Sequence, residues 1–179
     1  FITSSFTLDK ANPAMRKYLA SKADLVAAIR LPNTAFKGNA GTEVTTDVLF
    51  LKKRAPQTEP QGEPWIGTEP IAGTQRRPDG SRGPVQIPVN EYYARHPEMM
   101  LGQMTLEGSM YAGQTPTLSG DLTEELLNRA IAALPENVLE PLTIRQPSYD
   151  LSSIFPEKGA IKEGGYVVKD GVVMVLHGG

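Results

Sequence analysis

Cysteine is absent from the 179 residues of this chain, which excludes disulfides, thiolate nucleophiles and cysteine-ligated zinc. Histidine is scarce, and the two that occur, His96 and His177, lie far apart without the spacing of metal ligands. No apolar run approaches the roughly 18 residues that a membrane-spanning helix needs. We therefore expect no metal and no membrane contact, and the lack of cysteines and of a secretory signal favours a cytoplasmic protein.

A large excess of charge of one sign is lacking as well. The formal net charge is −2, so the chain as a whole is not a polycation. Any contact with nucleic acid must come from local basic groups, such as Lys52-Lys53-Arg54 or Arg76-Arg77 with Arg82. Hydrophobic residues make up 40% of the chain, which is enough to form a buried core.

The first 54 residues have the pattern of an α/β sheet. Residues 1–3 resemble the end of a buried strand, and Asn12-Pro13 is typical of a helix start, here of a helix over about 13–22. Residues 24–30 form a short continuous apolar run, as in a strand covered on both faces, and residues 44–51 are rich in β-branched side chains. The order strand, helix, strand, loop, strand predicts the end of a mainly parallel sheet.

Two further regions follow, 55–84 and 85–179. Six prolines with glycines and glutamines between them predict that 55–84 is a linker or loop without a packed element, in which Trp65 is a docking point. Region 85–179 should be a small α+β connector, with helices over 90–96 and from Asp121 to Leu134. It should end in a β-hairpin over 165–176, because Asp170-Gly171 is a preferred pair for a type I′ turn.

Phe36 is an isolated aromatic residue between two predicted strands. It precedes Lys37 and a loop rich in glycine and asparagine, and two interpretations are open. The ring either fills a local core or presents an aromatic face to a flat ligand. The basic triplet Lys52-Lys53-Arg54 is similarly open, because it is either a solvated strand end or a phosphate contact.

The stretch FITSSFTLDKANPAMRKYLASKADLVAAIRLPNTAFKGNAGTEVTTDVLFLKKR, residues 1–54, resembles the late part of the catalytic domain of N6-adenine DNA methyltransferases. The similarity is to type I restriction-modification subunits and to phage or plasmid methylase–helicase fusions. The similar features are the helix end MRKYLA, the Leu-Pro…Phe loop and a strand ending in Leu-Phe-Leu-Lys-Lys. PVNEYYARHPEMMLGQMTLEGSMYAG and YVVKDGVVMVL resemble the segment between methylase and helicase in those fusions. The resemblance implies a Rossmann-like methyltransferase sheet and DNA as the partner.

The resemblance also implies roles for individual residues. In relatives, an aromatic residue in the loop after the corresponding strand stacks on the adenine that is rotated out of the duplex, and the matching position is Phe36. Lys37, Lys52, Lys53 and Arg54 would then contact DNA phosphates without reading sequence.

Two motifs of that family are absent from this chain: the glycine-rich turn that binds S-adenosylmethionine and the Asn-Pro-Pro-aromatic tetrapeptide. Asn12-Pro13-Ala14 has no second proline and no aromatic residue. We therefore expect no catalytic or cofactor-binding residue here, no methylation by this chain alone, and an upstream half that supplies both motifs, with a helicase region as a further partner. The alternative is a non-enzymatic interaction or spacer module of such a protein. In either case an open sheet edge makes self-association a risk.

Overall fold

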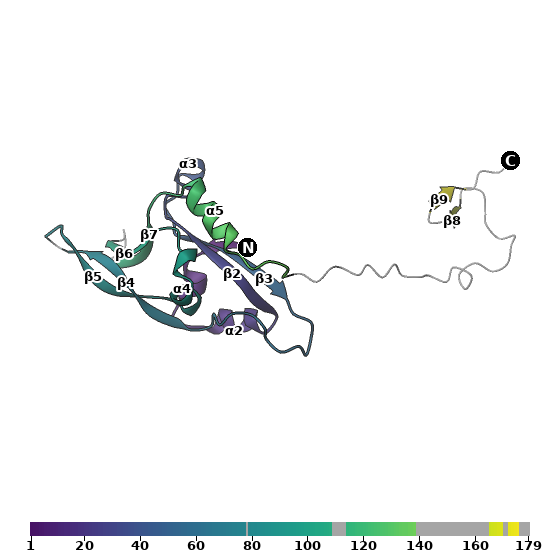
Figure 1. Ribbon diagram of the computed structural model, residues 1–179, viewed down its shortest axis with the longest axis horizontal. Helices are drawn as coiled ribbons and strands as arrows, with labels where there is room; N and C mark the ends of the chain where they lie inside the picture. Colours follow the sequence, from purple (N-terminus) through teal and green to yellow (C-terminus); the bar gives the residue numbers. More distant parts are fainter. Residues whose placement is uncertain (78, 109–113, 139–164, 170–171, 176–179) are drawn as a thin grey trace. The chain divides into compact units, whose positions relative to one another are not determined.

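The computed structural model describes residues 1–77, 79–108, 114–138, 165–169 and 172–175 (Figure 1). The chain divides into two compact units, Phe1–Glu140 and Pro141–Gly179. In the second unit, β8 (Tyr166–Lys169) and β9 (Val172–Val175) form an antiparallel pair with Lys169 opposite Val172. The predicted C-terminal hairpin is confirmed in these strands, and its Asp170-Gly171 turn lies outside the described residues.

The first unit begins with a three-stranded sheet in the order β1-β3-β2. Its strands are β1 (Ile2–Ser4), β2 (Ala23–Leu31) and β3 (Thr46–Lys53), and the helices beside them are α1 (Phe6–Asp9), α2 (Ala14–Ala20) and α3 (Lys37–Ala40). The predicted helix over 13–22 and the strands over 24–30 and 44–51 are confirmed. Asn12 helps to begin α2, because its side-chain oxygen accepts a hydrogen bond from the Ala14 amide at 3.0 Å.

The expectation of a mainly parallel sheet is wrong for these three strands, because β3 is antiparallel to both of its neighbours. The connection over 32–45 contains only the one-turn helix α3, so the chain returns at the same end of the sheet without crossing its face. Strands β1 and β2 still run in the same direction, joined by α1 and α2, with β3 between them. The fold is α/β, and the first sheet has one reversed strand.

A second sheet has the order β5-β4-β6-β7. Its strands are β4 (Thr68–Arg76), β5 (Arg82–Asn90), β6 (Gln103–Gly108) and β7 (Gln114–Ser119). Strand β4 is antiparallel to β5 and parallel to β6, while β6 and β7 are antiparallel. Helix α4 (Glu91–Arg95), a 3₁₀ turn (Pro97–Met99) and α5 (Glu124–Ala132) complete the described part of this unit.

The predicted linker over 55–84 is wrong from residue 68 onward, because β4 and the beginning of β5 lie there. Proline lacks an amide hydrogen and is therefore tolerated in edge strands. Pro84 and Pro88 are in the edge strand β5, and Pro70 lies in a part of β4 beyond its ladder with β6, which covers Thr74 and Gln75. The prolines therefore made the β4–β5 hairpin resemble a loop in the sequence.

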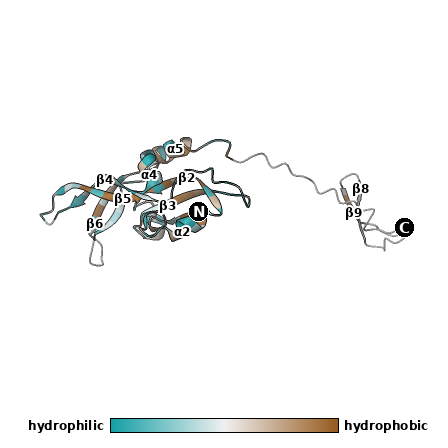
Figure 2. Ribbon diagram, turned by 90° about the horizontal axis from the view of Figure 1, so that it is seen from below, coloured by the Kyte–Doolittle hydropathy of each residue, from teal (hydrophilic) through white to brown (hydrophobic). Residues whose placement is uncertain are grey.

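One hydrophobic core joins the regions that the sequence analysis divided at residues 54 and 84. Leu25 and Ile29 of β2, Ile87 of β5 and Tyr93 of α4 all belong to it, and Trp65 is 3% exposed within it. Helices α2 and α5 lie on opposite sides of β2 and β3, and hydrophobic residues are concentrated toward these strands (Figure 2). Residues 1–138 therefore form one packed body, with no domain boundary at Arg54. None of the described helices is both long and apolar enough to cross a membrane.

Candidate nucleic-acid interface

The loop that carries Phe36 lies at the carboxyl end of β2. Strand β2 ends at Leu31 and β1 ends at Ser4, and both of these residues are opposite Thr46 of β3. Phe36 precedes α3, with its ring partly buried against the hydrophobic core. The ring therefore has a core contact as well as an exposed part, and both interpretations of Phe36 retain a physical basis.

The second sheet holds the start of this loop in place. The Asn33 amide donates a hydrogen bond to the Leu118 carbonyl at 2.8 Å, and the Thr34 hydroxyl donates to the Gly120 carbonyl at 2.7 Å. Leu118 is the penultimate residue of β7, so the loop is fixed to a strand more than eighty residues later in the chain. No feature of the sequence indicated this contact.

Lys37 is exposed beside Phe36, where the sequence analysis expected a phosphate contact. Its ammonium nitrogen is 2.6 Å from Glu43 Oε1, and both side chains are largely in solvent. The hydrogen bond with Glu43 raises the pKa of Lys37. Exposed ion pairs are weak, so a phosphate can compete with Glu43 for this ammonium group.

The basic triplet lies at the other end of β3. Lys53 is opposite Ala23, at the start of β2, whereas Phe36 follows the end of β2. A strand rises about 3.3 Å per residue, so the seven steps from Thr46 to Lys53 span about 23 Å. The structure therefore does not bring Lys52, Lys53 and Arg54 together with Phe36 and Lys37.

Arg54 has a structural role that argues against its predicted contact with DNA. Its guanidinium pairs with the Asp24 carboxylate and donates to the Ala20 carbonyl, and its side chain is only 8% exposed. It therefore fastens the end of β3 to the start of β2. Lys53 is exposed and Lys52 is partly exposed, and their phosphate contacts stay predictions.

An open hollow of about 800 Å³ lies beside this triplet. Asp24, Lys52, Lys53, Arg54 and Glu63 contribute charges of both signs to its lining. A neighbouring hollow of about 400 Å³ is more apolar and is lined by residues that include Phe1, Leu49 and Leu134. Phe36 lines neither of them, so these two hollows do not supply a base pocket beside its ring.

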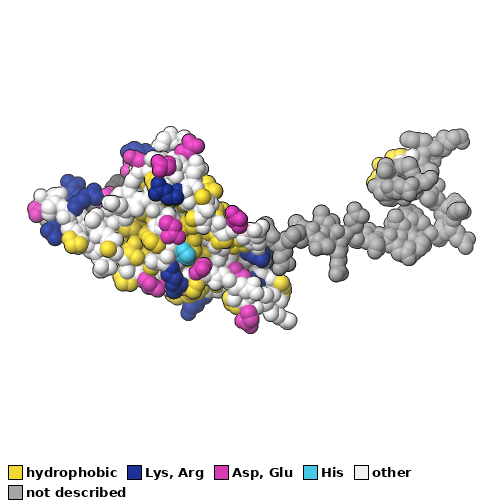
Figure 3. All heavy atoms as spheres, viewed as in Figure 1, with side chains coloured by type: hydrophobic (Ala, Val, Ile, Leu, Met, Phe, Trp, Pro, Cys, Tyr) yellow, Lys and Arg dark blue, Asp and Glu magenta, His cyan; other side chains and the backbone are white. Residues whose placement is uncertain are grey.

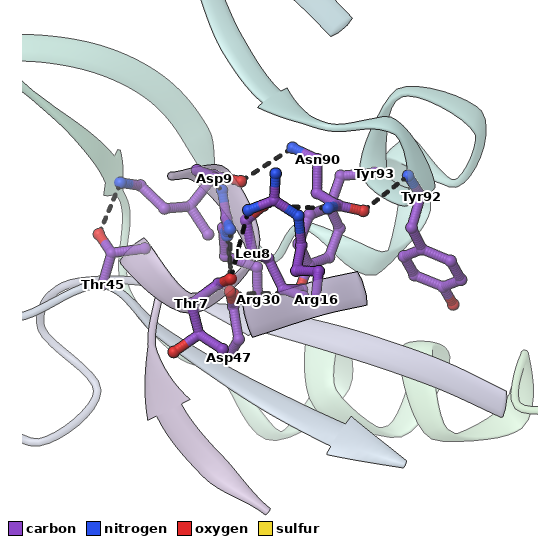
Figure 4. A network of polar contacts seen from close by, with 11 residues as sticks. Thr7, Leu8, Asp9, Arg16, Arg30, Thr45, Asp47, Asn90, Tyr92 and Tyr93 are labelled. Carbon is purple, nitrogen blue, oxygen red and sulfur yellow. Dashed lines mark hydrogen bonds and ion pairs between the residues drawn. The ribbon is translucent and has the colours of Figure 1, made fainter. Parts of the chain in front are cut away.

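A buried ionic network at the centre of the unit was not expected from the sequence (Figure 4). Arg30 of β2 has no exposed surface and donates two hydrogen bonds to Asp47 of β3, from Nε to Oδ1 at 2.7 Å and from Nη2 to Oδ2 at 2.9 Å. Its Nη1 donates to Asp9 Oδ2 of α1 at 2.6 Å. The guanidinium carbon also lies 4.3 Å from the centre of the Tyr93 ring.

Helix α4 and strand β5 complete the network from the second sheet. The Tyr93 hydroxyl donates to Asp47 Oδ1 at 3.0 Å, and the Asn90 amide donates to Asp9 Oδ1 at 2.8 Å. Burial raises the pKa of Tyr93 well above its ordinary value, which keeps this hydroxyl protonated as a donor. Burial also raises the pKa of Asp9, although the Arg30 charge opposes that shift.

The network is a structural element. Within the described residues, no buried side-chain nitrogen or oxygen lacks a hydrogen-bond partner, and no cluster of three or more His, Asp or Glu residues could hold a metal ion. A signal for it was present in the sequence, because Arg30 and Asp47 are charged residues inside two apolar strand runs. Such residues are rarely buried unless they are paired.

Comparisons with protein-family models, with curated proteins and with solved structures gave no match. What this chain does must therefore be argued from its residues and geometry.

Proposed function

We propose that this chain is the target-base side of an N6-adenine DNA methyltransferase, as the resemblance of residues 1–54 implies. The observation that carries the proposal is the position of Phe36. In open α/β sheets, ligands bind outside the carboxyl ends of the strands. The Phe36 loop lies at that end of β2, next to the carboxyl end of the parallel strand β1. Lys37 follows it, within reach of the backbone of the same DNA.

The first sheet is suited to be the end of a larger, Rossmann-like sheet. An antiparallel strand near one edge of a mostly parallel sheet is common in doubly wound folds, and β3 would have this arrangement with further parallel strands beside β1. Helices α2 and α5 cover both sides, as in such folds (Figure 2). Strand β1 has β3 as its only described neighbour, and Phe1 and Ile2 are 83% and 65% exposed. An exposed apolar edge of this kind is rarely left uncovered, so further strands of an upstream half would lie beside β1.

In this proposal the upstream half and the present chain have different roles in methyl transfer. S-adenosylmethionine supplies the methyl group for the adenine N6 atom, and this chain has no glycine-rich turn to hold it, so the upstream half would bind it. The residues of this chain would receive the adenine once it is rotated out of the duplex. Stacking of a base on an aromatic face contributes roughly 1–3 kcal/mol, which offsets much of the loss of stacking within the helix. Phe36 would supply that face and Lys37 would contact a phosphate.

The first test is the coding sequence upstream of Phe1. It should encode a glycine-rich turn and an Asp/Asn-Pro-Pro-aromatic tetrapeptide, and the complete gene product should form N6-methyladenine in duplex DNA, measured by mass spectrometry. The proposal would be contradicted by a longer reading frame that lacks both motifs. It would also be contradicted if the complete gene product formed no N6-methyladenine.

The second test separates stacking from packing at Phe36. Phe36→Leu retains most of the apolar volume but has no flat face, whereas Phe36→Tyr retains the face. With the complete gene product, the leucine variant should methylate much more slowly and the tyrosine variant at nearly the original rate. Thermal unfolding of the 179-residue chain is the control, and both variants should stay folded. Equal rates for the two variants would make Phe36 a core residue.

Two observations favour a second candidate: Phe36 is partly buried against the core, and it lines neither of the two hollows. In that case the chain is a non-enzymatic interaction or spacer module of a methylase–helicase protein, and the first sheet is a scaffold. Phe36→Leu would then leave methylation by the complete protein unchanged.

A further inference from the structure

The far end of the β4–β5 hairpin carries three arginines. Arg76 is directly opposite Arg82 across the two strands, and Arg77 follows Arg76 into the turn. All three are exposed, and basic side chains are visible at this end of the hairpin (Figure 3). Within the described residues, Arg76 and Arg77 lie in ion-pair distance of no carboxylate, and Arg82 approaches Glu107 only to 3.7 Å. The arginine end of the hairpin, defined by these three residues, is therefore a local positive patch on a chain of net negative charge.

The turn at this end has a defined geometry. The Arg77 amide donates to the Ser81 carbonyl at 2.8 Å, and Gly80 adopts a φ of +84°, which favours glycine. The Asp79 carboxylate accepts hydrogen bonds from the Ser81 amide at 2.8 Å and from its hydroxyl at 2.6 Å. This nearby acidic group is thus hydrogen-bonded within the turn and makes no ion pair with the arginines.

Arg77 is also held against the opposite strand. A Cβ atom on Gly83 would lie 2.4 Å from Nη2 of Arg77, so the guanidinium lies directly over the backbone of this glycine. The absence of a side chain at position 83 leaves room for the guanidinium. An arginine that is already positioned loses less freedom when it binds a ligand.

The arrangement is unfavourable for the isolated chain. Like charges directly opposite each other on neighbouring strands destabilise the pair, and within the described residues only Arg82 has a carboxylate in ion-pair distance, that of Glu107 at 3.7 Å. The arginines outside this patch in the described residues have partners: Arg16, Arg30, Arg54, Arg95 and Arg129 each bind a carboxylate or a backbone carbonyl. Arg76 and Arg77 have no such partner within the part of the chain that the structure describes, and this departure from the pattern points to an anionic ligand.

We propose that the arginine end of the hairpin binds the phosphates of duplex DNA. The planar guanidinium fork suits phosphate oxygens, and such contacts position a protein on DNA without reading its sequence. An anionic membrane surface is disfavoured, because none of the large hydrophobic side chains that are exposed in the described residues belongs to this hairpin. The choice of duplex DNA as the polyanion rests on the proposed methyltransferase function, but the inference goes beyond that function, because binding here requires neither Phe36 nor an upstream half.

The test is binding of the 179-residue chain to a short fluorescein-labelled DNA duplex, measured by fluorescence anisotropy against salt concentration. Three phosphate contacts predict a log–log slope of about −2.7, which is a roughly 40-fold loss of affinity between about 50 and 200 mM salt. The double variant R76Q/R77Q should bind more weakly and reduce the slope by about 1.8. The matched control K17Q/K22Q removes the same charge from exposed positions of α2 and its C-terminal side, and should bind as the unaltered chain does.

A third variant tests the opposite direction. Asp79→Asn removes a negative charge beside the arginines, while its amide oxygen can still accept the hydrogen bonds of Ser81. It should therefore bind the duplex more tightly than the unaltered chain. The fluorescence of buried Trp65 shows whether each variant is folded.

Several results would overturn the proposal. The unaltered chain would show no salt-dependent binding, the control pair would weaken binding as much as R76Q/R77Q, or anionic vesicles or single-stranded RNA would bind better than the duplex. Methylation by the complete gene product is measured separately. A loss of binding in R76Q/R77Q is therefore distinguishable from any failure of the Phe36 variants.

Discussion

Replacing Arg30 by methionine should destabilise the first unit more than most single substitutions can. Methionine fills much of the volume of the arginine stem but leaves Asp47 without a counter-ion. Asp47 is completely buried and would keep only the hydroxyl of Tyr93 as a side-chain partner. Removing one partner of a buried ion pair typically costs about 3–5 kcal/mol, because the other charge stays buried without compensation. We expect a loss of that size.

The same geometry predicts that the loss can be reversed. Replacing a complete buried ionic cluster by apolar side chains of similar volume is often neutral or stabilising. The triple variant R30M/D47L/Y93F removes the cation, the buried carboxylate and the hydroxyl that would otherwise lose its acceptor. Asp9 can remain, because its side chain is 11% exposed and it still accepts from the Asn90 amide. The triple variant should recover most of the stability that R30M loses.

The assay is urea unfolding followed by tryptophan fluorescence. Trp65 is the only tryptophan of the chain and is 3% exposed, so its emission should change when the core opens. The free energies of unfolding of the original chain, R30M and the triple variant form the comparison. A cost below about 1 kcal/mol for R30M would be typical of a surface pair and would refute the reasoning. So would a triple variant that is less stable than R30M.

Three further predictions concern pH, close packing and the domain boundary. Because burial, opposed by Arg30, raises the pKa of Asp9, the folded chain holds this proton more tightly. Protonated Asp9 therefore stabilises the folded chain below the ordinary pKa of about 3.9, and this contribution is lost as the pH rises through the higher pKa of the folded state. Relative to Asp9→Asn, the original chain should gain stability on acidification in urea titrations. Gly73→Ala should cost about 1–3 kcal/mol in the same assay, because its Cβ would lie 2.7 Å from the Met104 carbonyl. The control Gly38→Ala should cost nothing, because no atom lies within 4 Å. A chain ending at Arg54 should show no cooperative thermal unfolding by circular dichroism.

Elements with strong local signals could be predicted from the sequence. The continuous apolar run of β2, the β-branched residues of β3, Asn90 before α4 and the Asp-Gly pair in the C-terminal hairpin are all local features. Even there, the beginning of α5 was misplaced. Thr123, and not Asp121, caps this helix, because its hydroxyl accepts from the Leu126 amide at 3.2 Å.

The second sheet could not be predicted because its signals depend on position in the sheet. Pro70, Pro84 and Pro88 indicate a loop when they are read locally, and they fit strands only once β5 is known to be an edge. Strands β6 and β7 are short and rich in threonine and glutamine, so their alternation is weak.

The candidate site divides in the same way. The sequence could place Phe36 and Lys37 in one loop, because they are adjacent. It could not show that the basic triplet lies about 23 Å away along β3, since that distance follows from the antiparallel register. It also could not show that Arg54 is taken by Asp24, or that Asp47 receives the hydroxyl of Tyr93 from a helix forty-six residues later.

These long-range contacts connect the described strands of the second sheet to the loop that carries Phe36. The second sheet and its connections contact the chain at the end of β2. The Leu101 amide donates to the Arg30 carbonyl at 3.0 Å. The Asn33 amide, three residues after Arg30, donates to the Leu118 carbonyl of β7. Thr34, two residues before Phe36, donates its hydroxyl hydrogen bond to the Gly120 carbonyl. The position of the Phe36 ring is therefore set by both sheets. Thr34→Val, which removes the hydrogen bond to Gly120, should therefore slow methylation by the complete gene product if this loop receives the adenine.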